Sequence, residues 1–504
     1  MATVTIDHNG RLSQVPASPG MTLAEALHAA GVELSLPCGG QHSCGKCRVW
    51  AQGQLSAMSE RERQMLDGAP QGQRLACFTV VEGDCSLRTL SGGTDRILAD
   101  YRADPLPPAP IYDGGYGVAV DIGTTTVVGY LFSRTGNTPI AVQGSLNSQR
   151  SYGADVLSRI AYCNEHTVTP LQDAIRGQLD ALLYALCEKA GIGTEALSGL
   201  CVTGNTTMLH LLAGLEPRSL AMAPFTPQSV FGDWHSLDLP RFPGLRAYLP
   251  RCISAYVGAD ITCSVLSSGI ASSSKNLLLV DIGTNGEMVL RTPDGMIGTS
   301  TAAGPAFEGS GISAGMSAQS GAISTVWTED GQIRYGTVDD APAAGLCGSG
   351  LVDAVAAFLE TGVLDKRGRM AASFGGKAPL GDSGVFVTQK DIRQFQLAKG
   401  AIRGGMDVLL RHCGLSYDAL DQIILCGGFG SYLNVSSAQA IGLIPPDLAG
   451  RTTAIGNAAG AGAGNILQNT ARLTEAQDIA QAVRAIDLST DAYFKKRYVE
   501  AMLF

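Results

Sequence analysis

The chain has 504 residues, 45% of them hydrophobic and 16% charged, and its formal net charge at pH 7 is −9. This length is enough for three or four domains with buried cores. Because no basic stretch compensates the negative charge, we expect no nucleic-acid partner. The sequence begins without the features of a signal peptide, and no apolar run approaches the roughly 18 residues of a membrane span. Thirteen scattered cysteines fit a reducing compartment, so we expect a cytoplasmic protein without membrane contacts.

The first 90 residues have the pattern of a small mixed α/β domain. Two capping boxes, at residues 22–25 and 59–62, predict short helices, and Gly31 ends the first of them. An Asn-Gly pair at 9–10 predicts a tight hairpin turn. Strands are expected over residues 3–7, 12–17, 47–52, 75–81 and 85–90.

Four cysteines of this domain have the spacing C-x5-C-x2-C-x29-C, namely Cys38, Cys44, Cys47 and Cys77. Plant-type [2Fe–2S] proteins use C-x4-C-x2-C with a distant fourth cysteine, and the first gap here is one residue longer. Glycines among the cysteines allow the backbone to approach a cluster closely. The alternative is zinc, but structural zinc sites usually combine two C-x2-C pairs and only one exists here. We therefore predict a [2Fe–2S] cluster with these four ligands, and a strand position for Cys85.

Residues 91–116 read as a linker between domains. Four prolines lie between residues 105 and 110, where they prevent a helix or a central strand, and Gly-Gly pairs flank them. A proline-rich spacer is semi-rigid, so we expect the domains on its two sides to shift as units.

From residue 117 onward, apolar strands and helical segments alternate. A strand–turn–strand unit at 117–130 recurs at 277–290, which predicts two similar lobes, over 117–275 and 276–470. A C-terminal extension over 471–504 should add a surface helix and strand. Helices are expected over residues 154–163, 171–190, 254–270, 348–364, 389–413 and 458–467.

Each strand–turn–strand unit carries the same motif, Asp-Ile-Gly-Thr, at the end of its first strand. The turns offer backbone N–H groups and hydroxyls to phosphates, and Asp121 and Asp281 can hold Mg²⁺ or polarise an attacking water. A third apolar strand ends in a glycine turn against which an adenine can lie. The alternative is that these aspartates and threonines only cap turns. The predicted nucleotide-binding residues are Gly123, Thr124, Thr125, Thr126, Gly283, Thr284, Asn285, Gly286, Glu287, Gly427, Gly428, Gly430 and Ser431.

The order of these motifs resembles the acetate kinase, sugar kinase, heat-shock chaperone and actin superfamily. Residues 121–126 match its first phosphate motif, 281–287 its second and 426–431 its adenosine motif, while 203–213 and 457–467 occupy its two connecting positions. The fold class implied is α/β and α+β: an N-terminal β-grasp ferredoxin domain, a linker and a two-lobed, actin-like (ribonuclease H-like) ATPase.

The fusion with a ferredoxin is similar to the reductive activators of corrinoid-dependent methyltransferases. The segments 204–208, 281–287, 303–308 and 347–350 resemble that family. The resemblance implies an ATP-hydrolysing iron–sulfur oxidoreductase. It would pass one electron from the cluster to Co(II) of a corrinoid (cobalamin) protein and regenerate Co(I). It also implies ATP with Mg²⁺ as a cofactor, a corrinoid protein or methyltransferase as partner, and a low-potential electron donor. A homodimer is a candidate assembly.

Asp260 is a third candidate catalytic residue. It begins or lies within a helix that should cross between the lobes, where it could touch nucleotide-bound water or serve as a first-turn carboxylate. Glu287 could bind Mg²⁺ or lie at a strand edge. The glycine-rich loop over 302–315 could contact nucleotide or partner, or be a plain connection. His42 lies in the cysteine loop, where an exposed ring is the simpler interpretation.

Two other functions fit parts of the pattern. One is an ATP-dependent electron injector for a non-corrinoid partner, such as an acyl-CoA dehydratase or reductase, although those activators carry their cysteines inside the nucleotide domain. The other is a redox-sensing nucleotide-binding module without catalytic turnover. A sugar or acid kinase would explain the lobes but not the ferredoxin.

Overall fold

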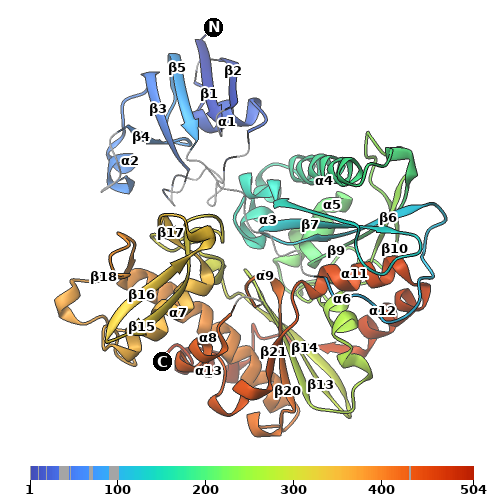
Figure 1. Ribbon diagram of the computed structural model, residues 1–504. Helices are drawn as coiled ribbons and strands as arrows, with labels where there is room; N and C mark the ends of the chain where they lie inside the picture. The colour runs from blue at the N-terminus through green and yellow to red at the C-terminus, as the bar shows by residue number, and fades with distance from the viewer. Residues whose placement is uncertain are drawn as a thin grey trace.

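The computed structural model describes residues 2–8, 11–18, 20–32, 34, 42, 45, 47–66, 72–89, 101–430 and 433–504. Its N-terminal domain is a five-stranded sheet in the order β2-β1-β5-β3-β4 with two short helices (Figure 1). The predicted strand over 75–81 is wrong, because Phe78 and Thr79 both donate N–H bonds to the Leu75 carbonyl and form a turn at Cys77. The predicted Asn-Gly turn lies outside the described residues. The elements are β1 (Ala2–His8), β2 (Arg11–Ala17), α1 (Leu23–Ala29), β3 (Arg48–Leu55), α2 (Glu60–Met65), β4 (Gln73–Leu75) and β5 (Val81–Thr89).

The two predicted capping boxes differ in outcome. At the start of α1, Thr22 and Glu25 cap each other as expected. At the start of α2, Ser59 accepts the N–H of Glu62, but the Glu62 carboxylate is buried and bonds Arg74 and the N–H of Leu75 instead. Burial opposes ionisation of Glu62, yet these bonds outweigh it and lower its pKa. This pair ties α2 to the segment that precedes Cys77.

The predicted linker is packed over its C-terminal half. Tyr101 donates its hydroxyl proton to Asn465, Asp104 forms an ion pair with Arg472, and Ala109 donates its N–H to the Gln468 carbonyl. The prolines therefore shape a strap held against the C-terminal helices, so residues 101–112 do not form the semi-rigid spacer that the sequence predicted. The first half of the predicted linker, residues 91–100, lies outside the described residues.

Lobe one is built on a six-stranded sheet in the order β10-β11-β9-β6-β7-β8. Apolar residues of β6, β7 and β9 are fully buried against α4 and α5. Because β6 and β9 are parallel, their carboxyl ends lie at one edge of the sheet, and the antiparallel β7 begins at that edge. Its elements are β6 (Tyr116–Ile122), β7 (Thr126–Ser133), β8 (Ala141–Leu146), α3 (Val156–Glu165), α4 (Thr169–Ala190), β9 (Leu197–Gly204), α5 (Thr206–Ala213), β10 (Asp233–Ser236) and β11 (Arg246–Leu249).

Lobe two repeats this arrangement, with a six-stranded sheet in the order β21-β20-β12-β13-β14-β22. A three-stranded and a two-stranded sheet extend it. Its elements are β12 (Leu277–Ile282), β13 (Gly286–Thr292), β14 (Gly295–Thr301), β15 (Ala322–Glu329), β16 (Gln332–Thr337), β17 (Gly345–Leu346), α7 (Gly348–Glu360), β18 (Lys377–Pro379), β19 (Phe386–Thr388), α8 (Gln389–His412), β20 (Gln422–Cys426), α9 (Gly427–Gly430), α10 (Val435–Ala440), β21 (Thr452–Ala454), β22 (Val483–Ala485) and α13 (Ala492–Glu500).

Two helices pack against each other between the lobes: α6 (Ala259–Ser268) and α11 (Ala458–Gln468). The small residues of α11 permit the contact, because a Cβ on Gly462 would lie 2.1 Å from the Cys263 carbonyl oxygen. Both α11 and α12 (Thr470–Ala482) lie beside lobe one, so residues 458–470 pack there although they follow lobe two in sequence (Figure 1). The predicted helix over 254–270 is shorter than expected, because Ser254 and Val257 close a turn before it. In the described part of the chain, no helix is long and apolar enough to cross a membrane.

Candidate functional site

A cavity of about 320 Å³ lies between the two lobes. It is lined by the predicted residues Asp121, Gly123, Thr124, Thr125, Thr126, Asp260, Asp281, Gly283, Thr284, Asn285, Glu287, Gly427 and Gly428. The structure thus brings together segments that are far apart in sequence. Gly286 and Gly430 do not line the cavity, because they face Ile402 and Leu425 in lobe two. Ser431 lies outside the described residues.

The two motif aspartates lie at equivalent ends of β6 and β12. Asp121 accepts a hydrogen bond of 2.9 Å from the Asn457 side chain, and Asp281 accepts the Cys426 thiol at 3.6 Å. Burial raises the pKa of Asp121 to about 7, with the nearby Asp281 adding to the effect. Burial likewise raises the pKa of Asp281 to about 6. A bound cation would favour the charged form of both carboxylates.

Asp260 and Glu287 add two more carboxylates to the same cavity. Asp260 lies in the first turn of α6, and Glu287 lies opposite Asp281 in the β12–β13 pair. Burial raises the pKa of both groups well above the ordinary value, and the charge of Asp281 adds to the effect on each. One carboxylate oxygen of Glu287 is buried without a hydrogen-bond partner.

These carboxylates fit Mg²⁺ better than a metal that needs a complete protein shell. Within the described ranges, no three His, Cys, Asp or Glu side chains are close enough to hold an ion alone. Mg²⁺ usually keeps several waters and binds one or two carboxylates together with the phosphates of a nucleotide. A divalent cation would also favour the charged forms of these buried carboxylates, whose pKa values burial raises.

Three polar residues that the sequence reasoning left out of the site support the turn of lobe one. Asn205 donates to the Thr124 hydroxyl at 3.2 Å, and Asn457 holds Asp121. Arg159 of α3 is fully buried and donates to the carbonyl oxygens of Thr124 and Gly153, at 2.5 and 3.0 Å. Burial lowers the pKa of Arg159 to about 9. A buried cation thus lies directly behind the first turn.

Glu308 connects the turns of the two lobes. It ends the short 3₁₀ helix η5 (Pro305–Glu308), within the loop over 302–315 whose role the sequence left open. One of its carboxylate oxygens accepts the Thr284 hydroxyl at 2.9 Å, and the other accepts the Thr125 hydroxyl. The two hydroxyl oxygens are 3.4 Å apart. The sequence marked this segment as family-like but did not predict this contact.

The glycine turn after β20 approaches Asp281 closely. Gly427 has a φ of +84°, and a Cβ at this position would lie 2.2 Å from an Asp281 carboxylate oxygen. Any other residue would therefore displace the carboxylate as well as strain the backbone. The sequence predicted that an adenine would lie against this glycine turn, whereas the close contact seen here is with the Asp281 carboxylate.

In the N-terminal domain, Cys47 and Cys77 converge. Their sulfur atoms are 3.2 Å apart, both side chains are buried, and the contact with Cys77 lowers the pKa of Cys47 to about 7. Two converging thiols, one of which has a lowered pKa, suit metal ligation. Cys38 and Cys44 lie outside the described residues, and Cys85 is buried in β5, as expected. The exposed His42 ring bonds the Cys77 carbonyl and stacks on Phe78.

Comparison with known proteins assigns all three parts of the chain. The model of a 2Fe-2S iron-sulfur cluster binding domain matches residues 6–82, and the model of the RACo middle region matches residues 116–273. The model of the C-terminal domain of RACo, the ASKHA domain, matches residues 275–504. The corrinoid activation enzyme RamQ of Eubacterium limosum is 35% identical over 420 residues, which are 77% of this chain and 70% of the relative. The chain belongs to the family of reductive activators of corrinoid proteins.

Other reductive activators agree with this assignment. The methylated amine-specific Co(II) corrinoid protein reductase of Methanosarcina barkeri is 27% identical over 76% of both chains. The solved structure of a reductive activator for a corrinoid, iron–sulfur protein superposes with a TM-score of 0.74 at 27% identity. The match covers all of this chain and 98% of the other. The predicted family and the predicted fold class are thus confirmed: a ferredoxin domain precedes an actin-like, two-lobed domain. The predicted domain boundaries stay predictions.

Proposed function

We propose that this reductive activator couples ATP hydrolysis to the transfer of one electron to the Co(II) of a corrinoid protein, which regenerates Co(I). The cluster would receive its electron from a low-potential donor. One observation carries the proposal: a single chain contains both converging cysteines of the cluster type and a cavity between two lobes. Carboxylates and phosphate-type turns line this cavity. The activities named for its relatives support the same conclusion.

The [2Fe–2S] cluster would be held by Cys38, Cys44, Cys47 and Cys77, and it would supply single electrons. A plant-type cluster has a potential near about −400 mV. Every 100 mV of uphill transfer costs about 2.3 kcal/mol per electron, so a Co(II) centre of lower potential needs an energy source. ATP hydrolysis at the lobe cavity would provide it by changing how the lobes grip the corrinoid protein.

In the nucleotide site, each residue has a task set by its position. The backbone N–H groups of 123–126 and 283–286 would bind the phosphates, and the Gly427 turn would receive the nucleoside. Asp121, Asp281 and Glu287 would hold Mg²⁺ through its waters, and Asp260 would orient one of those waters from α6. Mg²⁺ would supply charge neutralisation between the phosphates when bound. Arg159 would add a positive potential behind the first turn.

The test uses the full chain, purified without oxygen, with titanium(III) citrate, ATP and a panel of Co(II)-loaded corrinoid proteins. Co(I) is followed by its absorbance, and free cob(II)alamin serves as the small-molecule control. We expect Co(I) to form with at least one protein of the panel only when ATP is present. Cluster reduction by titanium(III) should not need ATP.

Two variants separate the two halves of the proposal. Cys47→Ser should remove most of the cluster absorbance and Co(I) formation while ATP binding persists, and Cys85→Ser is the matched control because that thiol lies in a strand. Stoichiometric zinc in place of iron would contradict the cluster. Equal rates of Co(I) formation with and without ATP would leave a redox-sensing module as the better interpretation.

A further inference from the structure

Glu308 occupies the position where the two lobes meet. Its two carboxylate oxygens accept hydroxyl bonds from Thr125 in the turn of lobe one and Thr284 in the turn of lobe two. These turns are the ones that would bind the phosphates, so a carboxylate at their meeting point would lie beside the terminal phosphate of a bound nucleotide. Glu308 is half-buried and lines the cavity, so water can reach it.

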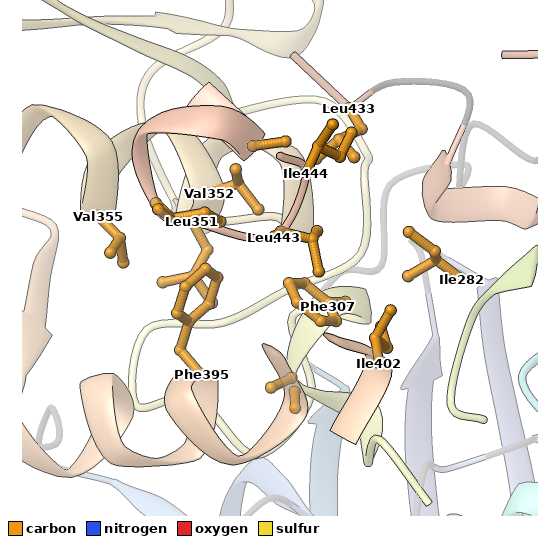
Figure 2. Packing of buried hydrophobic residues seen from close by; sticks show 14 of the residues in the cluster. Ile282, Phe307, Leu351, Val352, Val355, Phe395, Ile402, Leu433, Leu443 and Ile444 are labelled. Atoms are coloured by element: carbon orange, nitrogen blue, oxygen red, sulfur yellow. The ribbon is translucent and has the colours of Figure 1, made fainter. Parts of the chain in front are cut away.

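The backbone at Glu308 is fixed by the residues on both sides of it. Its neighbour Phe307 is fully buried in the core of lobe two, near Phe395, Ile402 and Leu443 (Figure 2). The Phe307 and Phe395 rings pack edge to face with centroids 5.3 Å apart. On the other side, Gly309 has a φ of +74°, and a Cβ there would lie 2.4 Å from the Met316 carbonyl oxygen.

The four other carboxylates of the cavity are less suited to accept a proton from water. Asp121 and Asp281 are each held by a donor, Asn457 or Cys426, and they lie at the positions proposed for the cation. Asp260 accepts the N–H of Ile261 in the first turn of α6, and Glu287 is buried behind Asp281 in the sheet. Glu308 differs because its two partners are hydroxyls, which can turn toward a phosphate and leave the carboxylate free.

We propose that Glu308 is the general base of ATP hydrolysis in this protein, an inference that rests on the proposed function. Water attacks the γ-phosphorus, and one of its protons passes to the Glu308 carboxylate. The bond between the γ-phosphorus and the bridging oxygen breaks, and its electron pair leaves with ADP. Glu308 then releases the proton to solvent as inorganic phosphate departs. General-base catalysis of this kind contributes about 10²- to 10⁴-fold in rate.

The test compares Glu308→Gln with the unaltered protein in Mg²⁺ and ATP, with and without the Co(II)-loaded corrinoid panel. Glutamine keeps the size of the side chain and can still accept the Thr284 hydroxyl, so the loop should fold. We expect kcat for hydrolysis to fall at least about 100-fold, while the Kd for ATP, measured by calorimetry, stays within about threefold. Glu360→Gln, at an exposed helix end, is the matched control.

A second variant tests the base by chemical rescue. Glu308→Ala should be equally slow, and added formate should restore part of its rate because it replaces the missing carboxylate. A Glu308→Gln variant that hydrolyses ATP as fast as the unaltered protein, or an alanine variant without formate rescue, would overturn the inference and leave the proposed function intact. If the unaltered protein hydrolyses no ATP with any member of the panel, the proposed function fails and the inference fails with it.

Discussion

The two lobes share one sheet topology but carry different chemistry at equivalent positions. Asp121 in β6 lies opposite Val128 and Thr203 on its neighbouring strands. Its counterpart in β12, Asp281, lies opposite Glu287 and Cys426. Lobe two therefore places a second carboxylate beside its aspartate, where lobe one has an apolar residue.

The buried cations of the two lobes differ in the same way. Arg159 of lobe one donates to the carbonyl of its phosphate-type turn. Lys399 of lobe two donates instead to the carbonyls of Ile441 and Leu503 and does not line the cavity. We therefore expect the lobes to have different roles in the site: lobe one contributes a buried cation behind its phosphate-type turn, and lobe two contributes a second carboxylate beside its aspartate.

The largest effect is expected from replacing the motif aspartate that both lobes share. Asp121→Asn and Asp281→Asn should each lower ATP hydrolysis at least about 100-fold, the scale of losing one preorganised electrostatic contact. If both aspartates act through one Mg²⁺, the rate loss in the double variant should be much smaller than the product of the two single losses. Steady-state hydrolysis by the four proteins gives the answer. Asp294→Asn, in the exposed turn between β13 and β14, is the control, and normal rates in both single variants would make the turns structural.

The next test removes the cation that distinguishes lobe one. Arg159→Met should raise the Kd for ATP about thirtyfold, because a hydrogen-bonded charge of this kind contributes roughly 2 kcal/mol. Arg159→Lys keeps the charge without the forked geometry, so we expect an intermediate affinity. Calorimetric ATP titrations measure both. An unchanged Kd in the methionine variant would mean that Arg159 only supports the turn at Thr124.

The sequence predicted those parts of the site that depend on local pattern. An apolar strand that ends in Asp and runs into a Gly-Thr turn is local information, and both copies lie at the cavity as expected. Contacts across the fold were not predictable in this way. Asn457 meets Asp121 across 336 positions of sequence, and Glu308 lies in a loop without periodicity. An arginine in a helix is normally expected to face solvent, yet Arg159 is fully buried.

The same limit explains the errors in the fold. The four prolines between residues 105 and 110 correctly predicted that this segment is not a helix. They carry no information on the helices against which the strap packs. The helix expected from residue 254 begins at 259, because the Ser254 hydroxyl accepts the N–H of Val257 and closes a turn first. Side-chain competition with the backbone of this kind needs the geometry of the turn, which composition does not contain.

The smallest expected effect concerns Lys399, the buried lysine of lobe two, and the pH dependence of the unfolding free energy. Burial, helped by the nearby charge of Arg403, lowers the pKa of Lys399 from its ordinary value to about 7. Between about pH 7 and 10.4 the unfolded chain therefore binds a proton at this site that the folded chain does not. The unfolding free energy gains from this group as pH rises, by at most about 1.4 kcal/mol per pH unit. Lys399→Met should remove that contribution, so urea unfolding at pH 7, 8 and 9 should show a smaller slope in the variant. Its ATP affinity should not change, in contrast to the Arg159 variants. Equal slopes would show that Lys399 remains charged in the fold, and a weakened ATP affinity would contradict the division of roles between the two lobes.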